Sequence, residues 1–529
     1  MGSEENHGDE FYVGAIDQGT TSTRFILYDR NACPVASHKM EFPQIYPQAG
    51  WVEHDPMVIL DTVKVCFQEA YAQATAQGLS IDGKMKAIGI TNQRETTIIW
   101  SKSTGLPLYN AIVWMDARTS AICRRLEQQL PMGRSQFVET CGLPISTYFS
   151  AMKLIWLLES VPEVKAAVES GDALFGTVET WIIWNLTQGA TKNKSEAGGI
   201  HVTDCSNAAR TMLMDLKTLE WHEPTLELLG IPKSILPRIV SNSEVIGYIA
   251  EGWLFSGIPI SGCLGDQHAA VLGQHCKKGE AKSTYGTGCF ILLNTGDEVI
   301  RSKHGLLSTV AFKLGPNAPT HYALEGSIAI AGAAVQWLRD SLGVIQNFGE
   351  VDGLANSVEN TGGVYFVPAF NGLFAPWWRE DARGVCVGIT RFTNRGHIAR
   401  AVLESICFQA IDVLRVMHAD AGHTNPEDYI LKVDGGASAS NLLLQLQANL
   451  LGSPVVRPAD VETTARGAAF AAGLAVGLWT EKQVLGEVSL SQRKAITFYP
   501  DSAKEDRVKR YECWCKAVER CFGLAELES

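Results

Sequence analysis

A glycine-centred turn near the start of the chain holds the first residues that could do chemistry. The segment Asp17–Arg24, DQGTTSTR, lies between two apolar runs, Tyr12–Ile16 and Arg24–Tyr28, which is typical of a β-hairpin. Backbone N–H groups that converge at such a turn can bind phosphate oxygens. Asp17, at the strand end, could hold Mg²⁺, which favours carboxylates and retains its waters. An ordinary polar hairpin has the same composition, so this turn alone leaves both interpretations open.

An aspartate on a second glycine turn is a candidate general base. Gly265-Asp266-Gln267 follows a strand pattern that begins at Ile258. A carboxylate held at a strand end could accept a proton from a substrate hydroxyl. The same aspartate could instead be the N-cap of a helix over Gln267–Leu272, and the two interpretations have similar weight here.

Two further glycine turns follow strands in the second half of the chain. Tyr285-Gly286-Thr287-Gly288 could hold phosphate, and Asp434-Gly435-Gly436-Ala437 follows the buried run Tyr429–Val433. Glycines there would let a flat ligand such as adenine approach the backbone closely. A plain strand-end turn is the commoner explanation for any single glycine pair.

A polar cluster in the first half suits a small polyol. Asn92–Thr97, NQRETT, follows the buried strand Ala87–Ile90, and aromatic residues lie further along at Trp114 and Tyr148. Donors and acceptors with aromatic walls are what a pocket for a polyhydroxy compound needs. The alternative is a solvated Arg94–Glu95 loop beside aromatic residues of the core.

The elements that must position these residues alternate between strands and helices. Pro56–Ala76 is predicted to be a helix, Gln188–Gly199 a surface loop, and Lys504–Leu527 an amphipathic surface helix. Such alternation favours an α/β protein. Similar glycine turns in each half indicate two related lobes. We expect a first lobe over residues 11–261, a second over 262–480, and a helical tail over 481–529 packed on the second lobe.

Composition excludes several classes of protein. The 529 residues carry a net charge of −12, which disfavours general binding of nucleic acid or anionic membranes. The 13 cysteines include no CxxC pair, which indicates buried thiols in a reducing, cytoplasmic compartment. No secretory signal and no apolar run long enough for a transmembrane helix is evident. P-loop, dinucleotide-binding, zinc-protease and serine-hydrolase motifs are absent too.

The joint order of the motifs resembles the FGGY carbohydrate kinases, of the superfamily that includes actin, heat-shock chaperones and sugar kinases. The resemblance runs from about residue 11 to about 480 and also rests on Gly50–Pro56, Tyr148–Ser150, Thr284–Phe290, Ala375–Trp378 and Gly384–Glu404. Asn92–Thr97 is its most specific segment, because it is similar to the members that phosphorylate glycerol rather than pentuloses or gluconate.

The resemblance implies two actin-like (ribonuclease H-like) ATPase domains with a cleft between them, ATP and Mg²⁺ as cofactors, and glycerol as acceptor. Asp266 would be the general base and Asp17 would hold the metal. Glycerol would be bound by Arg94, Glu95, Trp114, Tyr148, Asp266, Gln267 and Phe290. ATP would contact Thr20, Thr21, Ser22, Arg24, Thr287, Gly332, Gln336, Gly436 and Ser440. The product would be sn-glycerol 3-phosphate with ADP, and a homo-oligomer is left open.

Two residues depart from the family pattern. Ser440 stands near the expected adenine site where relatives usually have Asn. Arg466 replaces an apolar residue, so its guanidinium needs a partner or a route to solvent.

Alternative functions are a related kinase for another small polyol or ketose, and a non-catalytic nucleotide binder of the same fold. Asp17 and Asp266 disfavour the latter, and an actin-like filament or chaperone ATPase would lack Asn92–Thr97.

Overall fold

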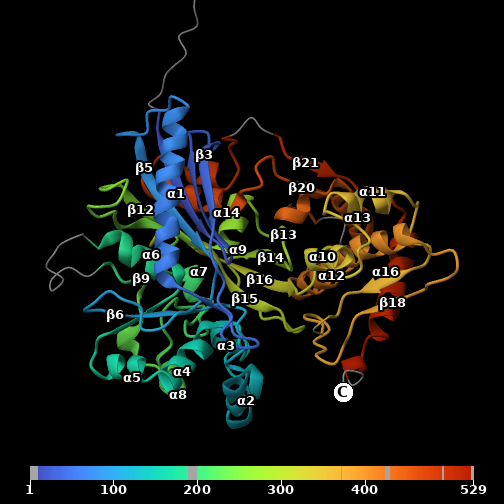
Figure 1. The fold of residues 1–529 in the computed structure, drawn as a ribbon, viewed down its shortest axis with the longest axis horizontal. Coiled ribbons are helices and arrows are strands. Elements are labelled where there is room, and N and C mark those ends of the chain that lie inside the picture. The colour runs from blue at the N-terminus through green and yellow to red at the C-terminus, as the bar shows by residue number, and fades with distance from the viewer. Residues whose placement is uncertain (1–9, 189–198, 371, 423–428, 491–493, 526–529) are drawn as a thin grey trace, which may run out of the picture.

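The computed structural model describes residues 10–188, 199–370, 372–422, 429–490 and 494–525. Two mixed sheets, each flanked by helices, form two lobes that lie side by side (Figure 1). The α/β class is therefore confirmed. The expected surface loop over 188–199 lies almost wholly outside the described residues.

The first sheet has the strand order β11-β12-β5-β1-β2-β3. Its strands are β1 (Tyr12–Gln18), β2 (Ser22–Tyr28), β3 (Pro34–Glu41), β5 (Met85–Asn92), β11 (Ser243–Tyr248) and β12 (Pro259–Gly265). β1 and β2 form the predicted antiparallel hairpin, whereas β5 runs parallel to both β1 and β12. The carboxyl ends of β1, β5 and β12 therefore meet at one edge of the sheet.

The second sheet has the order β15-β16-β14-β13-β19-β20-β21. Its strands are β13 (Ala281–Tyr285), β14 (Cys289–Gly296), β15 (Leu307–Lys313), β16 (Thr320–Ile328), β19 (Leu431–Asp434), β20 (Val455–Arg457) and β21 (Ile496–Phe498). An antiparallel hairpin, β13–β14, is again followed by parallel neighbours, because β13 pairs with β19 and β19 with β20. The two lobes thus repeat one topology, as the similar glycine turns predict.

Two helices lie between the sheets. α9 (Asp266–Gly273) and α14 (Thr463–Ala475) share an apolar cluster with residues from both sheets, including Val13, Leu264, Leu292 and Ala323. The contact is close because glycines face backbone: a Cβ on Gly89 would lie 2.1 Å from the Ala468 carbonyl oxygen. A helix from late in the chain thereby covers one face of the first sheet.

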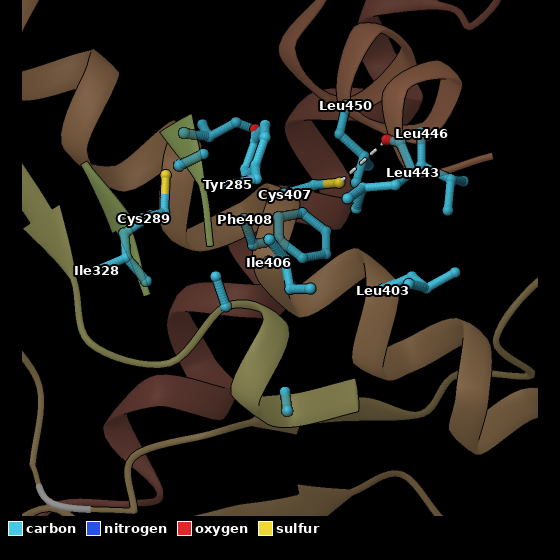
Figure 2. Packing of buried hydrophobic residues seen from close by; sticks show 14 of the residues in the cluster. Tyr285, Cys289, Ile328, Leu403, Ile406, Cys407, Phe408, Leu443, Leu446 and Leu450 are labelled. Atoms are coloured by element: carbon cyan, nitrogen blue, oxygen red, sulfur yellow. Dashed lines mark hydrogen bonds between the residues drawn. The ribbon is translucent and has the colours of Figure 1, made fainter. Parts of the chain in front are cut away.

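The outer faces are covered by other helices. α1 (Pro56–Ala76) has the predicted bounds and packs with α6 (Val178–Thr187) on the first sheet. On the second lobe, α12 (Arg395–Asp420) and α13 (Asn441–Leu451) interleave apolar side chains beside β13 and β14 (Figure 2). α16 (Lys504–Glu519) buries Trp514 against this core and carries charged residues outside; it begins at the predicted residue but ends at Glu519 rather than at Leu527.

The remaining elements are short or lie at the periphery. In the first half they are β4 (Glu53–His54), β6 (Ile98–Ser101), β7 (Ala111–Ile112), β8 (Ala173–Gly176), β9 (Val202–Asp204), β10 (Arg238–Val240), α2 (Ser120–Gln129), α3 (Val138–Cys141), α4 (Ser150–Ser160), α5 (Pro162–Glu169), α7 (Cys205–Ala208) and α8 (Glu223–Leu229). In the second half they are α10 (Gly332–Asp340), α11 (Glu350–Asn356), β17 (Tyr365–Val367), β18 (Val385–Val387) and α15 (Glu481–Val484). In the described residues, 3₁₀ turns cover Gly133–Ser135, Lys233–Ile235 and Gly436–Ala439.

Two structural features bear on the expected lobe boundaries. Residue 261 falls inside β12, which is hydrogen-bonded into the first sheet, and the tail over 481–529 contributes the edge strand β21 as well as helices. We therefore propose a boundary between α9 and β13. Nine of the cysteines are buried thiols. Among the helices in the described ranges, none is long and apolar enough to cross a membrane.

Candidate active site

Three carboxylate-bearing strand ends meet at one edge of the first sheet. Asp17 lies near the end of β1, Arg94 and Glu95 follow β5, and Asp266 follows β12 as the first residue of α9. In open α/β sheets, ligands bind outside the carboxyl ends of the strands. Most of the residues predicted from the first half are therefore brought together.

Arg94 is a buried hub of this site and is only 3% exposed. Its Nε lies 3.2 Å from Asp266 Oδ1. Its Nη1 and Nη2 donate to the two carboxylate oxygens of Glu325 at 2.6 and 3.0 Å. Glu325 belongs to β16 in the second sheet, so this ion pair joins the two lobes.

Glu95 is held in an unusual backbone conformation beside Arg94. Its φ is +62°, in the left-handed region, and its side chain is fully buried. Arg210, which follows α7, donates through Nε to Glu95 Oε1 at 2.6 Å and through Nη2 to Glu325 Oε1 at 3.1 Å. Burial raises the pKa of Glu95. Burial also opposes ionisation of Glu325, but Arg210 and Arg94 outweigh it and lower that pKa to about 2.

Three aromatic rings form the wall expected beside this cluster. The Trp114 ring lies 5.5 Å from that of Tyr148 and 5.9 Å from that of Phe290, between ring centroids. Trp114 Nε1 donates to Thr20 Oγ1 at 2.9 Å, which ties the wall to the β1–β2 turn. The wall, the turn and the charged cluster are thus continuous.

The carboxyl group of Asp266 remains partly accessible, with 27% of the side chain exposed. The Gln267 backbone N–H donates to Asp266 Oδ1 at 2.6 Å. Burial raises the pKa of Asp266, and the charges of Arg94 and Lys282 act against that rise. Burial likewise raises the pKa of Asp17, to about 6. Asp266 is thus a carboxylate whose affinity for a proton is increased.

A cavity of about 540 Å³ opens on the second lobe. Its lining includes all the nucleotide-site residues predicted from that lobe: Thr287, Gly332, Gln336, Gly436 and Ser440. A Cβ on Gly436 would meet nothing within 4 Å, so the backbone there is open to a ligand.

Ser440 has two roles in this cavity wall. Its Oγ donates to Asp352 at 2.7 Å and accepts from the Leu443 N–H at 3.0 Å, which caps α13. Asp352 also lines the cavity. The departure from the family pattern at Ser440 therefore leaves a polar wall, made by a serine–aspartate pair.

Arg24 has a partner that the sequence does not predict. The resemblance implies that it faces the phosphates with Thr20, Thr21 and Ser22, and in this structure its guanidinium forms an ion pair with Glu462, just before α14. The backbone at Gly19 and Ser22 closes the turn through an N–H···O bond of 2.9 Å. Arg466, the second departure, has a partner: its Nε and Nη2 donate to the Gly273 carbonyl.

Sequence reasoning missed four charged residues of these sites: Arg210, Lys282, Glu325 and Asp352. Lys282 Nζ donates to Gln267 Oε1 and, at 2.9 Å, to Thr284 Oγ1. A signal existed for two of them, because Arg210 and Glu325 are single charges in apolar segments, and a buried charge needs partners. Which partners they find is set by the fold.

Comparisons with known proteins agree with this arrangement. Residues 12–273 match the N-terminal domain, and residues 281–476 the C-terminal domain, of the FGGY family of carbohydrate kinases. The chain is 66% identical over 521 residues to a glycerol kinase of Arabidopsis thaliana, covering 98% of each chain. It is 49% identical over 518 residues to a glycerol kinase of Clavibacter michiganensis, covering 98% of this chain and 99% of that one.

Solved structures confirm the expected two-domain fold. The structure of Plasmodium falciparum glycerol kinase with ADP superposes with a TM-score of 0.88 at 38% identity, covering 96% of this chain and 98% of that one. A ligand-bound xylulose kinase from Lactobacillus acidophilus gives a TM-score of 0.81 at 26% identity, with the same coverage. With matching family domains over most of its length, the chain belongs to the FGGY family of carbohydrate kinases.

Proposed function

We propose that this protein is an ATP-dependent glycerol kinase, which transfers the γ-phosphate of ATP to a terminal hydroxyl of glycerol. The products are sn-glycerol 3-phosphate and ADP. The observation that carries the proposal is the cluster of buried Arg94, buried Glu95 and partly accessible Asp266 beside the aromatic wall. The high identity to glycerol kinases of two organisms supports the same acceptor.

The proposed acceptor site combines charged and apolar side chains. Arg94 can donate to a hydroxyl oxygen, Glu95 can accept from a hydroxyl, and Gln267 lies next to Asp266. Trp114, Tyr148 and Phe290 would contact the carbon edge of the acceptor, since the Trp114 ring lies within 6 Å of each of the other two rings. A closely spaced wall favours a three-carbon polyol over a larger sugar.

Asp266 is proposed as the general base. Its carboxylate would accept the proton of the attacking hydroxyl, whose oxygen then forms a bond to the γ-phosphorus as the bond to ADP breaks. A pKa raised by burial brings the base nearer to the working pH, where proton acceptance contributes most. Phosphoryl transfer otherwise depends on positioning and on stabilisation of charge.

The nucleotide would bind across both lobes. Thr20, Thr21 and Ser22 in the β1–β2 turn would face the terminal phosphates, and the second-lobe cavity would hold the adenosine. Arg24 would approach the phosphates only by leaving Glu462. The glycine at position 436 leaves room for a flat base or sugar.

The donor set fits a magnesium ion brought in with the nucleotide. Asp17 is a carboxylate close enough to Asp266 for their charges to interact. The described residues hold no cluster of three potential metal ligands, which agrees with a cation that takes one or two carboxylates and keeps its waters and phosphate ligands. When bound, Mg²⁺ would neutralise charge on the phosphate oxygens.

An ADP-release assay with Mg·ATP tests the proposal. Glycerol is compared with dihydroxyacetone, xylulose, gluconate and no acceptor, because xylulose and gluconate kinases share the fold. Activity on glycerol well above the others is expected. Equal release without an acceptor would contradict the proposal, and preference for xylulose or gluconate would replace it.

The buried thiols further support a reducing compartment, and we propose the cytoplasm.

A further inference from the structure

We propose that Glu325, which belongs to the second lobe, is a positioning residue for the acceptor site. Its carboxylate orients Arg94 so that the guanidinium can donate a hydrogen bond to the substrate while Nε faces Asp266. This inference rests on the proposed function. Glu325 lies in β16 and is 1% exposed, and its partners Arg94 and Arg210 both belong to the first lobe.

The geometry around Glu325 leaves little freedom. Oε2 accepts from Arg94 Nη1 at 2.6 Å, while Oε1 accepts from Arg94 Nη2 at 3.0 Å and from Arg210 Nη2 at 3.1 Å. A two-point contact between a planar guanidinium and a carboxylate fixes the plane as well as the position of the arginine. Arg94 is therefore held by an element that itself carries no other residue of the acceptor site.

The Nε donor of Arg94 shows what this orientation achieves. Both terminal nitrogens bind Glu325, and Nη2 also donates to the Tyr148 hydroxyl at 3.4 Å, while Nε faces Asp266 Oδ1 at 3.2 Å and Glu95 Oε1 at 3.9 Å. If Glu325 lost its charge, these two carboxylates would be the nearest anionic partners for Arg94. The guanidinium would shift toward Asp266 and away from its place beside the substrate.

Arg210 completes the arrangement on the other side. It bridges Glu95 and Glu325, and its guanidinium carbon lies 5.4 Å from the ring centroids of both Tyr148 and Phe149. One carboxylate from the second lobe thus fixes the positions of Arg94 and Arg210, the two arginines beside Glu95 and the aromatic wall. Acceptor recognition is complete only where both lobes contribute.

A purely structural ion pair makes a different prediction. Losing a buried charge then lowers stability and affects both substrates alike, whereas a positioning role acts on the acceptor. The test is Glu325→Gln, which keeps the side chain's size and removes its charge. We expect the KM for glycerol to rise roughly 10–100-fold, because hydrogen bonds to charged groups are the strong ones, with the KM for ATP within about 2-fold.

A matched control is Glu53→Gln. Glu53 is also a buried carboxylate, 3% exposed and paired with Arg118, but it does not contact Arg94 or Asp266. The control is expected to lose stability without a selective rise in the KM for glycerol. An equal rise of both KM values in Glu325→Gln, or a selective glycerol effect in Glu53→Gln, would overturn the inference.

A second comparison shows whether Glu325 acts through Arg94. Arg94→Lys keeps a positive charge but cannot make the two-point contact. On that background, Glu325→Gln should change the KM for glycerol by less than about 3-fold, since the orientation is already lost. A full 10-fold or greater effect on both backgrounds would show that Glu325 acts independently, against the inference.

Folding and function are separated by two further measurements. If Glu325→Gln does not fold, Glu325→Asp is used, which keeps the charge but shortens the side chain by one methylene. This variant should raise the KM for glycerol without raising the KM for ATP. A wild-type KM for glycerol would overturn the inference. A wild-type enzyme without glycerol-dependent ADP release would instead refute the proposed function itself.

Discussion

Asp266, the proposed general base, is the residue whose replacement tests the proposed mechanism most directly. We predict that Asp266→Asn lowers kcat by ~10²–10⁴-fold, the usual contribution of a general base, while glycerol still binds. The amide retains the shape of the side chain but cannot accept the proton. Steady-state ADP release measures kcat, and calorimetry with glycerol measures binding. Near-normal turnover in a folded variant would remove Asp266 as the base.

The pH dependence of activity follows from the same burial. Asp266 must be ionised to accept a proton, and burial raises its pKa, as it raises the pKa of neighbouring Asp17 to about 6. We therefore expect kcat/KM for glycerol to fall as the pH decreases, with a midpoint above the ordinary range of aspartate pKa values. Initial rates across a buffer series, at saturating Mg·ATP, give the profile. Constant kcat/KM down to about pH 4, where ordinary carboxyls titrate, would contradict it.

The Ser440–Asp352 pair gives a prediction for the nucleotide cavity. Ser440→Ala removes the hydroxyl that holds Asp352 and caps α13. We expect a loss of about 1 kcal/mol in the free energy of unfolding and a ~2–10-fold rise in the KM for ATP. Denaturant unfolding and ATP kinetics measure the two effects. Ser440→Thr, which keeps the hydroxyl, is the control, and an unchanged KM for ATP in Ser440→Ala would contradict the assignment.

Among single residues, the sequence predicts those that lie within a motif. It does not predict residues such as Glu325 and Arg210, which are distant in the chain and contact a motif residue only in the fold. Arg94, Glu95 and Asp266 each follow a strand, so local pattern suffices to find them. Glu325 contacts Arg94 across 231 residues of chain, and Arg210 reaches Glu95 across 115. A single charge in an apolar segment marks such a residue but does not name its partner.

The helix α1, which has strong local signals at its start, has the predicted bounds. α1 begins at Pro56 after Asp55, whose side chain accepts from the Met57 N–H, so cap and proline both define its start. The predicted boundary at residue 261 falls inside the strand β12, and the strand β21 lies in a tail that the sequence predicts to be helical. β12 belongs to the first sheet because it pairs with β5, and β21 is a three-residue strand that pairs with β20. A local sequence pattern reveals neither pairing.

The contact between β5 and α14 can be tested through one glycine. Gly89→Ala places a Cβ 2.1 Å from the Ala468 carbonyl oxygen, so strand and helix must separate. We expect a loss of ~1–3 kcal/mol in the free energy of unfolding, as for other overpacked sites. Gly353→Ala is the control, because a Cβ there meets nothing within 4 Å. Equal stability of the two variants, measured by denaturant unfolding, would contradict the close packing.

For the whole molecule, the first lobe depends on a helix from the end of the second. α14 packs on β1, β5 and β12, and Ser243 and Ser261 donate side-chain hydrogen bonds to Ala471 and Ala472. We predict that a fragment ending at residue 280 lacks a cooperative unfolding transition, because one face of its sheet is uncovered. Calorimetry and dye binding to exposed apolar surface test this, with the full chain as control. A sharp transition in the fragment would contradict it.

The late position of α14 also has a consequence during synthesis. A ribosome adding 5–20 residues per second needs roughly 10–40 s to pass from the end of α9 to the end of α14. Throughout that interval the nascent first lobe presents the apolar face that α14 later covers. The chain therefore emerges as a client for chaperones that shield apolar surface. Slow codons between the two helices would lengthen that exposure, and would lower the yield of active protein without changing a single residue.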